Sequence, residues 1–483
     1  MKLLTMSNEG TSEYCCNAVK IGEITPISGK DKIATTIVNG EVIVIRKDQV
    51  KEGDILFYAS NECQLNSTFL SLNNLFEISE RDKNANAEEV NTLMAEGKVD
   101  EAKSKVGYFN KYGRVRMIKL GGVLSMGYLF SVDELAKFCP EVKTLNLEEI
   151  LNQDFDTVGG ELFVKAYVPP IKERKNRKGS GPEKKDKTEK FDRMIPGQFA
   201  FHYDTAPLQK NMYKISPLDM VTISVKMHGT SAIYSNIQTK FPIKLPWYKK
   251  IINFFKKDYF PTFYVGYDVI YSSRKVIKNK SVNPKVTDGY YNKDVWREYY
   301  DILKDKIPFD VSLYGEICGF SGEKAIQKGY DYKCKPGENI LMIYRITTNM
   351  EDGKKYEWEP NEVVDFVLKL TQEHTELQGK IIPLPVIYQG TLKDLYPEVS
   401  TFEHWHENIL LKLQEDKNFL MEELEPMCNN KVPREGICLR INYDKTPECF
   451  KLKCKKFLEK EAKNIDKGDV DIEMINNSEI DSN

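Results

Sequence analysis

Lys226 is the residue of this chain whose surroundings best suit covalent chemistry. It follows residues 221–225, where apolar and hydroxyl side chains alternate with the period of a half-buried β-strand. Gly229 comes three residues later, and glycine permits close backbone approach to a ligand. An amine attacks phosphorus only when it is unprotonated, so cations or a metal must lower the pKa of the lysine. Taken alone, Lys-x-x-Gly is more typical of an exposed strand-end lysine.

Three later stretches offer residue types that suit a nucleotide site. Arg274 follows a strand-like stretch, where its guanidinium could hydrogen-bond ribose or phosphate oxygens. Glu316 is a carboxylate inside an apolar strand-like stretch, which is costly unless it meets a hydroxyl, a cation or a metal. Tyr344 could stack on a purine, although a core tyrosine is an equally good interpretation.

A fourth stretch places a carboxylate and two lysines in a predicted hairpin. Glu435 precedes one strand-like run, and Lys451 and Lys453 end the next, where the period of two puts both lysines on one face. Two neighbouring ammonium groups repel each other unless anions lie between them, and a triphosphate supplies such anions. These cations would also depress the pKa of a nearby lysine. Glu435 could hold a divalent metal that bridges phosphate oxygens.

In this order the motifs resemble those of the covalent nucleotidyltransferases, which comprise ATP-dependent DNA and RNA ligases and mRNA capping enzymes. The resemblance covers about 200–455 and rests on Lys226-x-His228-Gly229, Arg274, Gly315-Glu316, Tyr344, Glu435-Gly436 and Lys451-Leu452-Lys453. His228 and the ending at 450–458 look most like RNA ligases of the RNA-editing and nick-repair type. Val225 departs from the pattern, because family members often carry an acidic residue just before the nucleophile.

The resemblance implies a three-step reaction. Lys226 would attack the α-phosphate of ATP, AMP would pass to an RNA 5′-phosphate, and a 3′-hydroxyl would displace AMP to repair a nicked or broken strand. The implied nucleotide-binding residues are Lys226, Gly229, Arg274, Glu316, Tyr344, Glu435, Lys451 and Lys453. Glu435 would bind Mg²⁺ or Mn²⁺, and Tyr344 would stack on adenine. Arg274 and Glu316 would contact the nucleoside and ribose.

The implied fold is α+β. An ATP-grasp-like nucleotidyltransferase domain of antiparallel sheets with helices would follow a small all-β, OB-like barrel, because residues 19–24 and 52–58 resemble the RNA ligases with such a module. Asn39-Gly40 is a strong hairpin signal within it. Arg114, Arg116 and Lys119 are its candidate RNA contacts, although a solvated strand face is at least as good an interpretation.

We expect the OB-like, nucleic-acid-binding module at 1–168, with a helical insertion near 81–105. A basic flexible linker at 169–190, the ligase domain at 191–460 and a polar tail at 461–483 would follow. Residues 361–371 and 409–424 are predicted helices. The segment 241–261 is predicted to contain an amphipathic helix, for which packing on the parent domain is favoured over binding to a membrane surface.

Composition and short motifs indicate the compartment, the metal content and the partners of the protein. No apolar run approaches the length that spans a membrane, and the first residues lack the apolar core of a signal peptide. Ten cysteines without C-x-x-C pairs favour reduced thiols and argue against structural zinc. His404 and His406 would not share a helix face, so they do not indicate a metal site. We therefore expect a cytoplasmic monomer with RNA partners and no membrane partner.

Three alternatives to an RNA ligase are open on sequence alone. A capping guanylyltransferase or a DNA ligase would normally continue into a C-terminal barrel, and only residues 454–483 follow Lys453. A protein that binds nucleic acid without catalysis could keep the same scaffold, but the intact Lys226, Glu435, Lys451 and Lys453 argue against it. An ATP-dependent RNA ligase is the leading hypothesis.

Overall fold

The computed structural model describes residues 2–7, 13–168, 192–203, 205–256, 259–283, 294–399, 405–419, 424–441 and 447–466. The chain divides into two compact units. The N-terminal unit is Met1–Pro169 with Ala206–Tyr213, and the C-terminal unit is Pro170–Thr205 with Lys214–Asn483. The segment 206–213, which the sequence assigned to the second domain, therefore belongs to the first. The whole of the predicted linker at 169–190 lies outside the described residues.

Short antiparallel strands build the N-terminal unit, as the closely spaced turn signals predict. They are β1 (Leu4–Thr5), β2 (Cys16–Lys20), β3 (Thr25–Pro26), β4 (Ile33–Val38), β5 (Glu41–Arg46), β6 (Ile55–Ala59), β7 (Cys63–Leu65), β8 (Ile118–Leu120), β9 (Val123–Ser125), β10 (Tyr128–Phe130), β11 (Asp154–Phe155), β12 (Thr157–Val158), β13 (Glu161–Leu162), β14 (Val164–Ala166) and β15 (Ala206–Pro207). Within this unit they pair as β10-β6-β2-β11, β1-β12-β13, β3-β4-β5, β7-β14 and β8-β9, and the described pairings close no barrel.

Helices make the N-terminal unit mixed α+β, so the expectation of an all-β module is wrong in this respect. They are α1 (Ser67–Leu72), α2 (Ala87–Ala95), α3 (Val99–Ser104), α4 (Val132–Phe138) and α5 (Leu208–Asn211). Helices α2 and α3 occupy the segment where the helical insertion is predicted. The predicted hairpin is confirmed, because Asn39 and Gly40 join β4 to β5 with positive φ angles of 49° and 72°.

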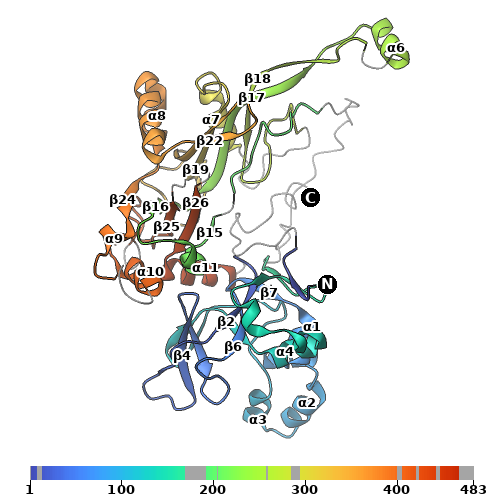
Figure 1. Ribbon diagram of the computed structural model, residues 1–483, viewed down its shortest axis with the longest axis vertical. Helices are drawn as coiled ribbons and strands as arrows, with labels where there is room; N and C mark the ends of the chain where they lie inside the picture. Colours follow the sequence, from blue (N-terminus) through green and yellow to red (C-terminus); the bar gives the residue numbers. More distant parts are fainter. Residues whose placement is uncertain are drawn as a thin grey trace. The chain divides into compact units, whose positions relative to one another are not determined.

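The C-terminal unit contains two antiparallel sheets (Figure 1). Its strands are β16 (Met220–Lys226), β17 (Thr230–Pro242), β18 (Phe263–Ser272), β19 (Val311–Ser321), β20 (Lys324–Ala325), β21 (Asn339–Asn349), β22 (Lys355–Glu357), β23 (Ile381–Pro383), β24 (Val386–Thr391), β25 (Gly436–Ile441) and β26 (Glu448–Lys453). The smaller sheet has the order β26-β25-β16-β24 within this unit. The larger has the order β18-β17-β19-β21-β22, with β20 beside β19 and β23 parallel to β21.

The helices of the C-terminal unit are α6 (Trp247–Phe255), α7 (Val295–Leu303), α8 (Pro360–Glu373), α9 (Leu392–Leu395), α10 (Trp405–Glu415) and α11 (Lys455–Asp466). Helix α8 confirms the helix predicted at 361–371. The helix predicted at 409–424 starts earlier and ends at Glu415. Helix α11 extends beyond the predicted domain end at 460 and buries Ala462 and Ile465, so the polar tail does not begin at 461.

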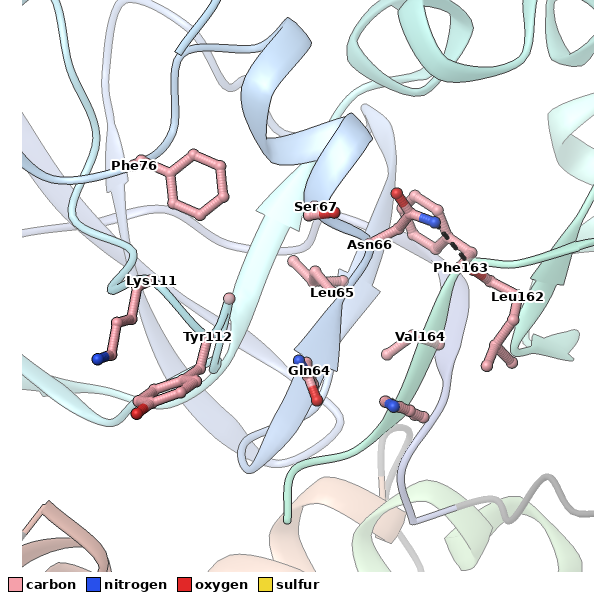
Figure 2. Close-up of a pocket in the computed structure, with 12 residues that line it drawn as sticks. Gln64, Leu65, Asn66, Ser67, Phe76, Lys111, Tyr112, Leu162, Phe163 and Val164 are labelled. Carbon is pink, nitrogen blue, oxygen red and sulfur yellow. Dashed lines mark hydrogen bonds between the residues drawn. The ribbon is translucent and has the colours of Figure 1, made fainter. Parts of the chain in front are cut away.

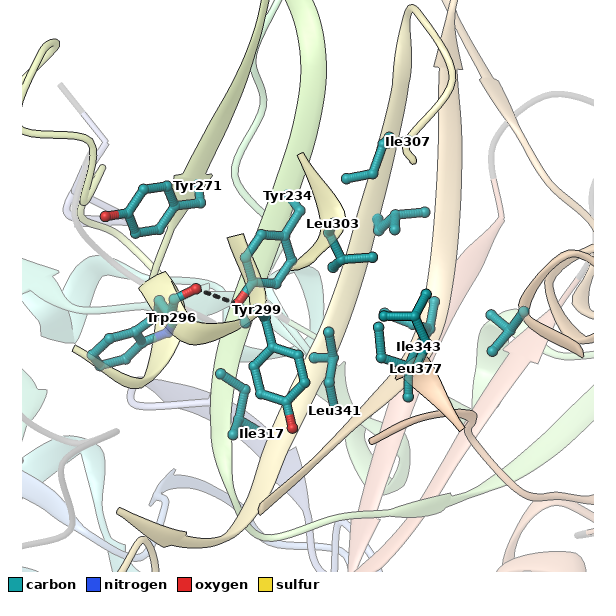
Figure 3. Close-up of a cluster of buried hydrophobic side chains, with 14 of the residues drawn as sticks. Tyr234, Tyr271, Trp296, Tyr299, Leu303, Ile307, Ile317, Leu341, Ile343 and Leu377 are labelled. Carbon is teal, nitrogen blue, oxygen red and sulfur yellow. Dashed lines mark hydrogen bonds between the residues drawn. The ribbon is translucent and has the colours of Figure 1, made fainter. Parts of the chain in front are cut away.

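Helices α7 and α8 pack on the larger sheet around one apolar core (Figure 3). Tyr234 of β17 donates a hydrogen bond to the carbonyl oxygen of Trp296 at 3.0 Å, which satisfies its hydroxyl inside that core. Ile317 of β19 also points into the core. Because side chains alternate along a strand, the neighbouring Glu316 lies on the opposite face of the sheet. This alternation directs a carboxylate away from the apolar core.

Helix α6 differs from its prediction. It is helical as expected, but none of its residues is buried, so it does not pack on the parent domain. Figure 1 shows it at the far end of the long hairpin of β17 and β18. Among the described residues, no helix has the length and apolar character required to cross a bilayer.

Candidate functional site

Lys226 is the last residue of β16, a strand held between β24 and β25. Lys226 lies opposite Gly436 of β25, and Gly436 lies opposite Lys453 of β26. Residues directly opposite in adjacent strands project to the same face of a sheet. Lys226 and Lys453 therefore share one face, with a glycine between them. An added Cβ at Gly436 would come within 2.1 Å of the Leu452 carbonyl oxygen, so this position has no room for a side chain.

Glu435 is the partner of Lys226. Its Oε1 lies 2.7 Å from Lys226 Nζ, and its side chain is only 3% exposed. Its other oxygen, Oε2, is buried without a hydrogen-bond partner among the described residues and lies 3.7 Å from His228 Nδ1. Burying a charged oxygen without a partner is costly. The carboxylate therefore has one oxygen committed to the lysine and one suited to a cation.

The turn after Lys226 is held by the larger sheet and by a loop. The N–H of His228 donates to the Tyr332 hydroxyl at 2.8 Å, and the N–H of Gly229 donates to Glu316 Oε1 at 3.1 Å. Gln327 Nε2 donates to the Gly229 carbonyl oxygen at 2.9 Å. A Cβ on Gly229 would lie 2.4 Å from the Ile317 carbonyl oxygen, so this glycine is required by close approach to β19.

The two predicted lysines of β26 differ in their surroundings. Lys451 lies opposite Cys438, which lies opposite Ser224, so it occupies the same face as Lys226 one row further along the sheet. Lys451 is buried, whereas Lys453 is half-buried and lies 3.4 Å from Glu461 Oε2 of α11. Burial raises the pKa of the neighbouring Cys438 thiol to about 12. That thiol is therefore neutral near pH 7 and a poor nucleophile beside Lys226.

Tyr344 lies beside this arrangement, whereas Arg274 is placed only by its position after β18. Tyr344 of β21 and Ser224 of β16 line one cavity of about 50 Å³. Ser224 precedes Lys226 by two residues and shares its face, so the cavity adjoins the strand that ends at Lys226. It is far smaller than the roughly 300–1,000 Å³ of usual ligand pockets, so a base there requires side-chain movement. Arg274 is half-buried and follows the end of β18.

A family model described as RNA ligase matches residues 219–455, the part of the chain that contains this arrangement. The domain that carries Lys226 belongs to the RNA ligase family. The predicted enzyme class, an RNA ligase of the nucleotidyltransferase type, is thereby confirmed. No curated protein is significantly similar to the chain in sequence.

Solved RNA ligase structures from Naegleria gruberi have a similar fold. An apo mutant is 18% identical, with a TM-score of 0.52, and the match covers 93% of this chain and 99% of that one. A mutant solved with AMP and Mn has the same identity and coverage, with a TM-score of 0.51. A mutant solved with ATP and Mn is 17% identical, with a TM-score of 0.51 and coverages of 92% and 98%. At these identities the likeness establishes the α+β fold.

Two residues that hold the turn after Lys226 were missed by sequence reasoning. Tyr332 and Gln327 come from the irregular loop after β20, which has no strand or helix period to mark its buried side chains. Tyr332 has a positive φ of 46°, a conformation uncommon outside glycine, asparagine and aspartate. The only sequence signal is the aromatic pair Tyr330-Asp331-Tyr332, which is also common in ordinary cores.

Glu316 has a structural contact as well as its predicted nucleotide contact, and two variants separate them. We expect Glu316→Ala to lower the free energy of unfolding by about 1–3 kcal/mol, because the buried N–H of Gly229 loses its acceptor. Glu316→Gln keeps one acceptor oxygen, removes the charge and replaces the second oxygen with an NH2 group. If Glu316 also contacts the nucleotide, Glu316→Gln slows formation of the AMP adduct while the melting temperature stays near the wild-type value. Normal adduct formation by that variant would assign Glu316 a structural role alone.

The structure contradicts the prediction that Arg114 of the N-terminal unit contacts RNA. Its side chain is 2% exposed and makes two hydrogen bonds, of 2.7 and 2.8 Å, to Glu62, so it is committed to the interior. Arg116 is half-buried and donates to the Tyr108 carbonyl oxygen at 2.7 Å. Lys119 is exposed on β8. The three residues do not form a shared basic face, because the first is buried and only the third lies in a strand.

The N-terminal unit instead presents a pocket of about 250 Å³ (Figure 2). Gln64, Lys111, Tyr112 and Lys165 line it, and Lys111 Nζ lies 4.9 Å from the centre of the Tyr112 ring. Aromatic and lysine side chains are groups with which proteins hold single-stranded nucleic acid. Sequence reasoning missed this pocket because its residues come from four separate stretches of the chain.

Proposed function

We propose that this RNA ligase joins RNA 3′-hydroxyl and 5′-phosphate ends with ATP, through a covalent AMP on Lys226. One observation carries the proposal. Lys226 ends a central strand beside the buried carboxylate of Glu435, with Lys453 in the same cross-strand row. The similar Naegleria gruberi structures solved with AMP or ATP and Mn support ATP as the nucleotide and a divalent cation as its companion.

In the first step, Lys226 Nζ forms a bond to the α-phosphorus of ATP as the bond to the pyrophosphate oxygen breaks. The ion pair with Glu435 orients Nζ, but it also favours the ammonium form, so the pair must separate and Nζ must lose a proton before attack. The positive charge of Lys453 on the same face favours that loss. It also stabilises the negative charge that develops on the phosphate oxygens.

The residues around Glu435 fit a divalent cation. Glu435 Oε2 is buried without a hydrogen-bond partner among the described residues. The described residues contain no cluster of three or more histidine, cysteine, aspartate or glutamate side chains that could hold a metal by themselves, so the phosphates and water would have to supply the other ligands. Mg²⁺ commonly binds through one or two carboxylates together with phosphate oxygens and water, and Glu435 would supply the protein ligand for Mg²⁺ or Mn²⁺. When bound, such a cation neutralises phosphate charge and competes with Lys226 for the carboxylate.

The later steps use RNA ends. The 5′-phosphate of one RNA displaces Lys226 from AMP, and the 3′-hydroxyl of another then displaces AMP to form the phosphodiester. The pocket around Tyr112 in the N-terminal unit supports a role for that unit in holding RNA.

We propose strand repair in the cytoplasm as the setting. All ten cysteines carry free thiols, as expected in a reducing compartment.

Lys451 and Lys453 are proposed to hold the ATP phosphates. We expect Lys451→Ala and Lys453→Ala each to slow AMP-adduct formation by about 100- to 1,000-fold, the usual cost of removing one group that stabilises developing charge. Lys463→Ala is the matched control, because Lys463 lies on α11 with an exposed side chain. Rapid-quench measurement of the adduct at several ATP concentrations gives both rate and affinity. Wild-type rates in both β26 variants would refute the phosphate role.

The substrate assignment is tested with RNA ends of defined chemistry. Purified protein, ATP and Mg²⁺ are incubated with a nicked RNA duplex and, separately, with single-stranded RNA, each with either a 5′-phosphate or a 5′-hydroxyl. We expect a joined product only when a 3′-hydroxyl meets a 5′-phosphate. Joining of 5′-hydroxyl ends would overturn the proposed chemistry. Transfer of GMP from GTP to RNA, without joining, would favour a capping enzyme.

A further inference from the structure

Helix α6 lies at the end of a long projecting hairpin. Strands β17 and β18 are paired from Ile233 opposite Ser272 as far as Pro242 opposite Phe263, and α6 lies in the connection between them. Figure 1 shows the helix at the tip, away from the helices that cover the sheets of the same unit. None of its residues is buried. The helix therefore adds nothing to the apolar core of the ligase domain.

One face of α6 is apolar and exposed. Trp247, Phe254 and Phe255 are 74%, 85% and 78% exposed. At 100° per residue, these three side chains share one face of the helix with Tyr248, Ile251 and Ile252. The polar residues Lys249, Lys250 and Asn253 occupy the opposite side. A contiguous aromatic and aliphatic surface of this kind in a soluble protein marks an interaction site.

The direction in which the apolar face points is fixed by the polar side of the helix. Asn253 donates from Nδ2 to the Phe260 carbonyl oxygen and accepts the Phe260 N–H at Oδ1, both at 2.8 Å. Lys249 Nζ lies 4.7 Å from the centre of the Phe260 ring. These contacts hold the polar side of α6 against the returning chain. The apolar side therefore faces away from the hairpin.

The charge of the segment indicates what covers this face. Lysines recur at Lys240, Lys244, Lys249, Lys250, Lys256 and Lys257, and no aspartate or glutamate occurs from residue 240 to residue 257. Lysines beside an apolar face rich in tryptophan and phenylalanine are the composition of helices that lie in the interface of anionic membranes. We propose that α6 binds the surface of a membrane containing anionic lipids, with its apolar face inserted among the headgroups.

RNA and a second copy of the chain fit the apolar face of α6 less well than a membrane does. RNA would pair with the lysines and stack on the aromatic rings, but Ile251 and Ile252 offer no flat ring to a base, and they lie among the aromatic side chains. A second copy of the chain would bring two lysine-rich segments together and would repel at low salt. A membrane surface accommodates both features, because its acyl chains receive the apolar face and its phosphate groups receive the lysines. The proposal departs from the expectation of no membrane partner.

Vesicle binding by the full chain tests the proposal. We expect the protein to cosediment with vesicles of phosphatidylcholine and phosphatidylserine, and to bind pure phosphatidylcholine roughly tenfold less tightly or worse. Phe254→Ser with Phe255→Ser, and separately Lys244→Glu with Lys250→Glu, should each lower binding by roughly tenfold or more. Leu218→Ser is the control, since Leu218 is an exposed apolar residue outside the hairpin. Melting curves of all variants establish that each is folded.

Tryptophan fluorescence tests directly whether α6 enters the lipid. The fluorescence of Trp247 should shift to shorter wavelength on addition of anionic vesicles and be quenched by brominated acyl chains, and Trp247→Phe should remove both changes. Equal binding by the wild-type chain and the Phe254 and Phe255 variant would overturn the proposal. Loss of single-stranded RNA binding in that variant, with no vesicle binding by the wild-type chain, would also overturn it and assign the tip to RNA.

Discussion

Lys226→Ala is expected to abolish RNA joining with ATP while leaving the protein folded. The side chain is needed as the nucleophile. Its removal leaves Glu435 without its ion-pair partner and lowers the free energy of unfolding, but the backbone pairing of its strand does not depend on it. By the proposed chemistry, Lys226 acts only while AMP is carried from ATP to the RNA end. The variant should therefore still seal RNA that already carries AMP on its 5′-phosphate.

Lys226→Arg is the matched control for that result. Arginine keeps the positive charge beside Glu435, yet a guanidinium stays protonated in proteins and cannot attack phosphorus. We expect it to behave as Lys226→Ala does with ATP and to seal pre-adenylylated RNA. Joining of RNA with ATP at a normal rate in either variant would contradict the assignment of Lys226 as the nucleophile. Failure of both variants on pre-adenylylated RNA, with normal melting curves, would show that Lys226 also acts in sealing.

Glu435→Gln is expected to have the second largest effect. Glutamine keeps the size of the side chain and its contact with Lys226 but removes the negative charge that suits a divalent cation. Because metal-ion stabilisation of a phosphoryl transition state amounts to several kcal/mol, we expect adduct formation to slow by about a hundredfold or more. The Mg²⁺ concentration that gives half-maximal rate should also rise.

A titration of rate against Mg²⁺ concentration separates this role from a loss of stability. Glu357→Gln is the control, because Glu357 is a carboxylate paired with Arg345 at 2.7 Å rather than with Lys226. That variant can lower the melting temperature, but it should keep the wild-type metal dependence. An unchanged Mg²⁺ dependence in Glu435→Gln would remove Glu435 from the metal site.

The strand-borne part of the site was predictable because strand periodicity is a local signal. The period of two around Lys451 and Lys453 correctly predicts that both lysines project to one face, and the hairpin from Glu435 to Lys453 is present in register. The same rule explains Glu316, whose neighbours fill the core while its carboxylate lies on the other face. The roles of these residues toward ATP remain predictions.

The failed predictions share a different cause, which is dependence on partners distant in sequence. The sequence around Arg114 is typical of an exposed basic strand, but the Arg114 guanidinium pairs with Glu62, 52 positions earlier in the chain. Helix α6 has the period of a packed surface helix, and nothing in that period shows whether another element covers its apolar face. Tyr332 reaches His228 from an irregular loop. Local patterns do not contain these pairings.

Formation of a covalent AMP adduct tests the central claim most directly. Wild-type protein is incubated with α-labelled ATP and Mg²⁺, and with α-labelled GTP in parallel, then separated by denaturing electrophoresis. Peptide mass spectrometry of the labelled band locates the nucleotide. We expect a band with ATP alone, lost in Lys226→Ala, and AMP on the peptide that contains Lys226. Absence of a band with both nucleotides, or AMP on another residue, would contradict the account.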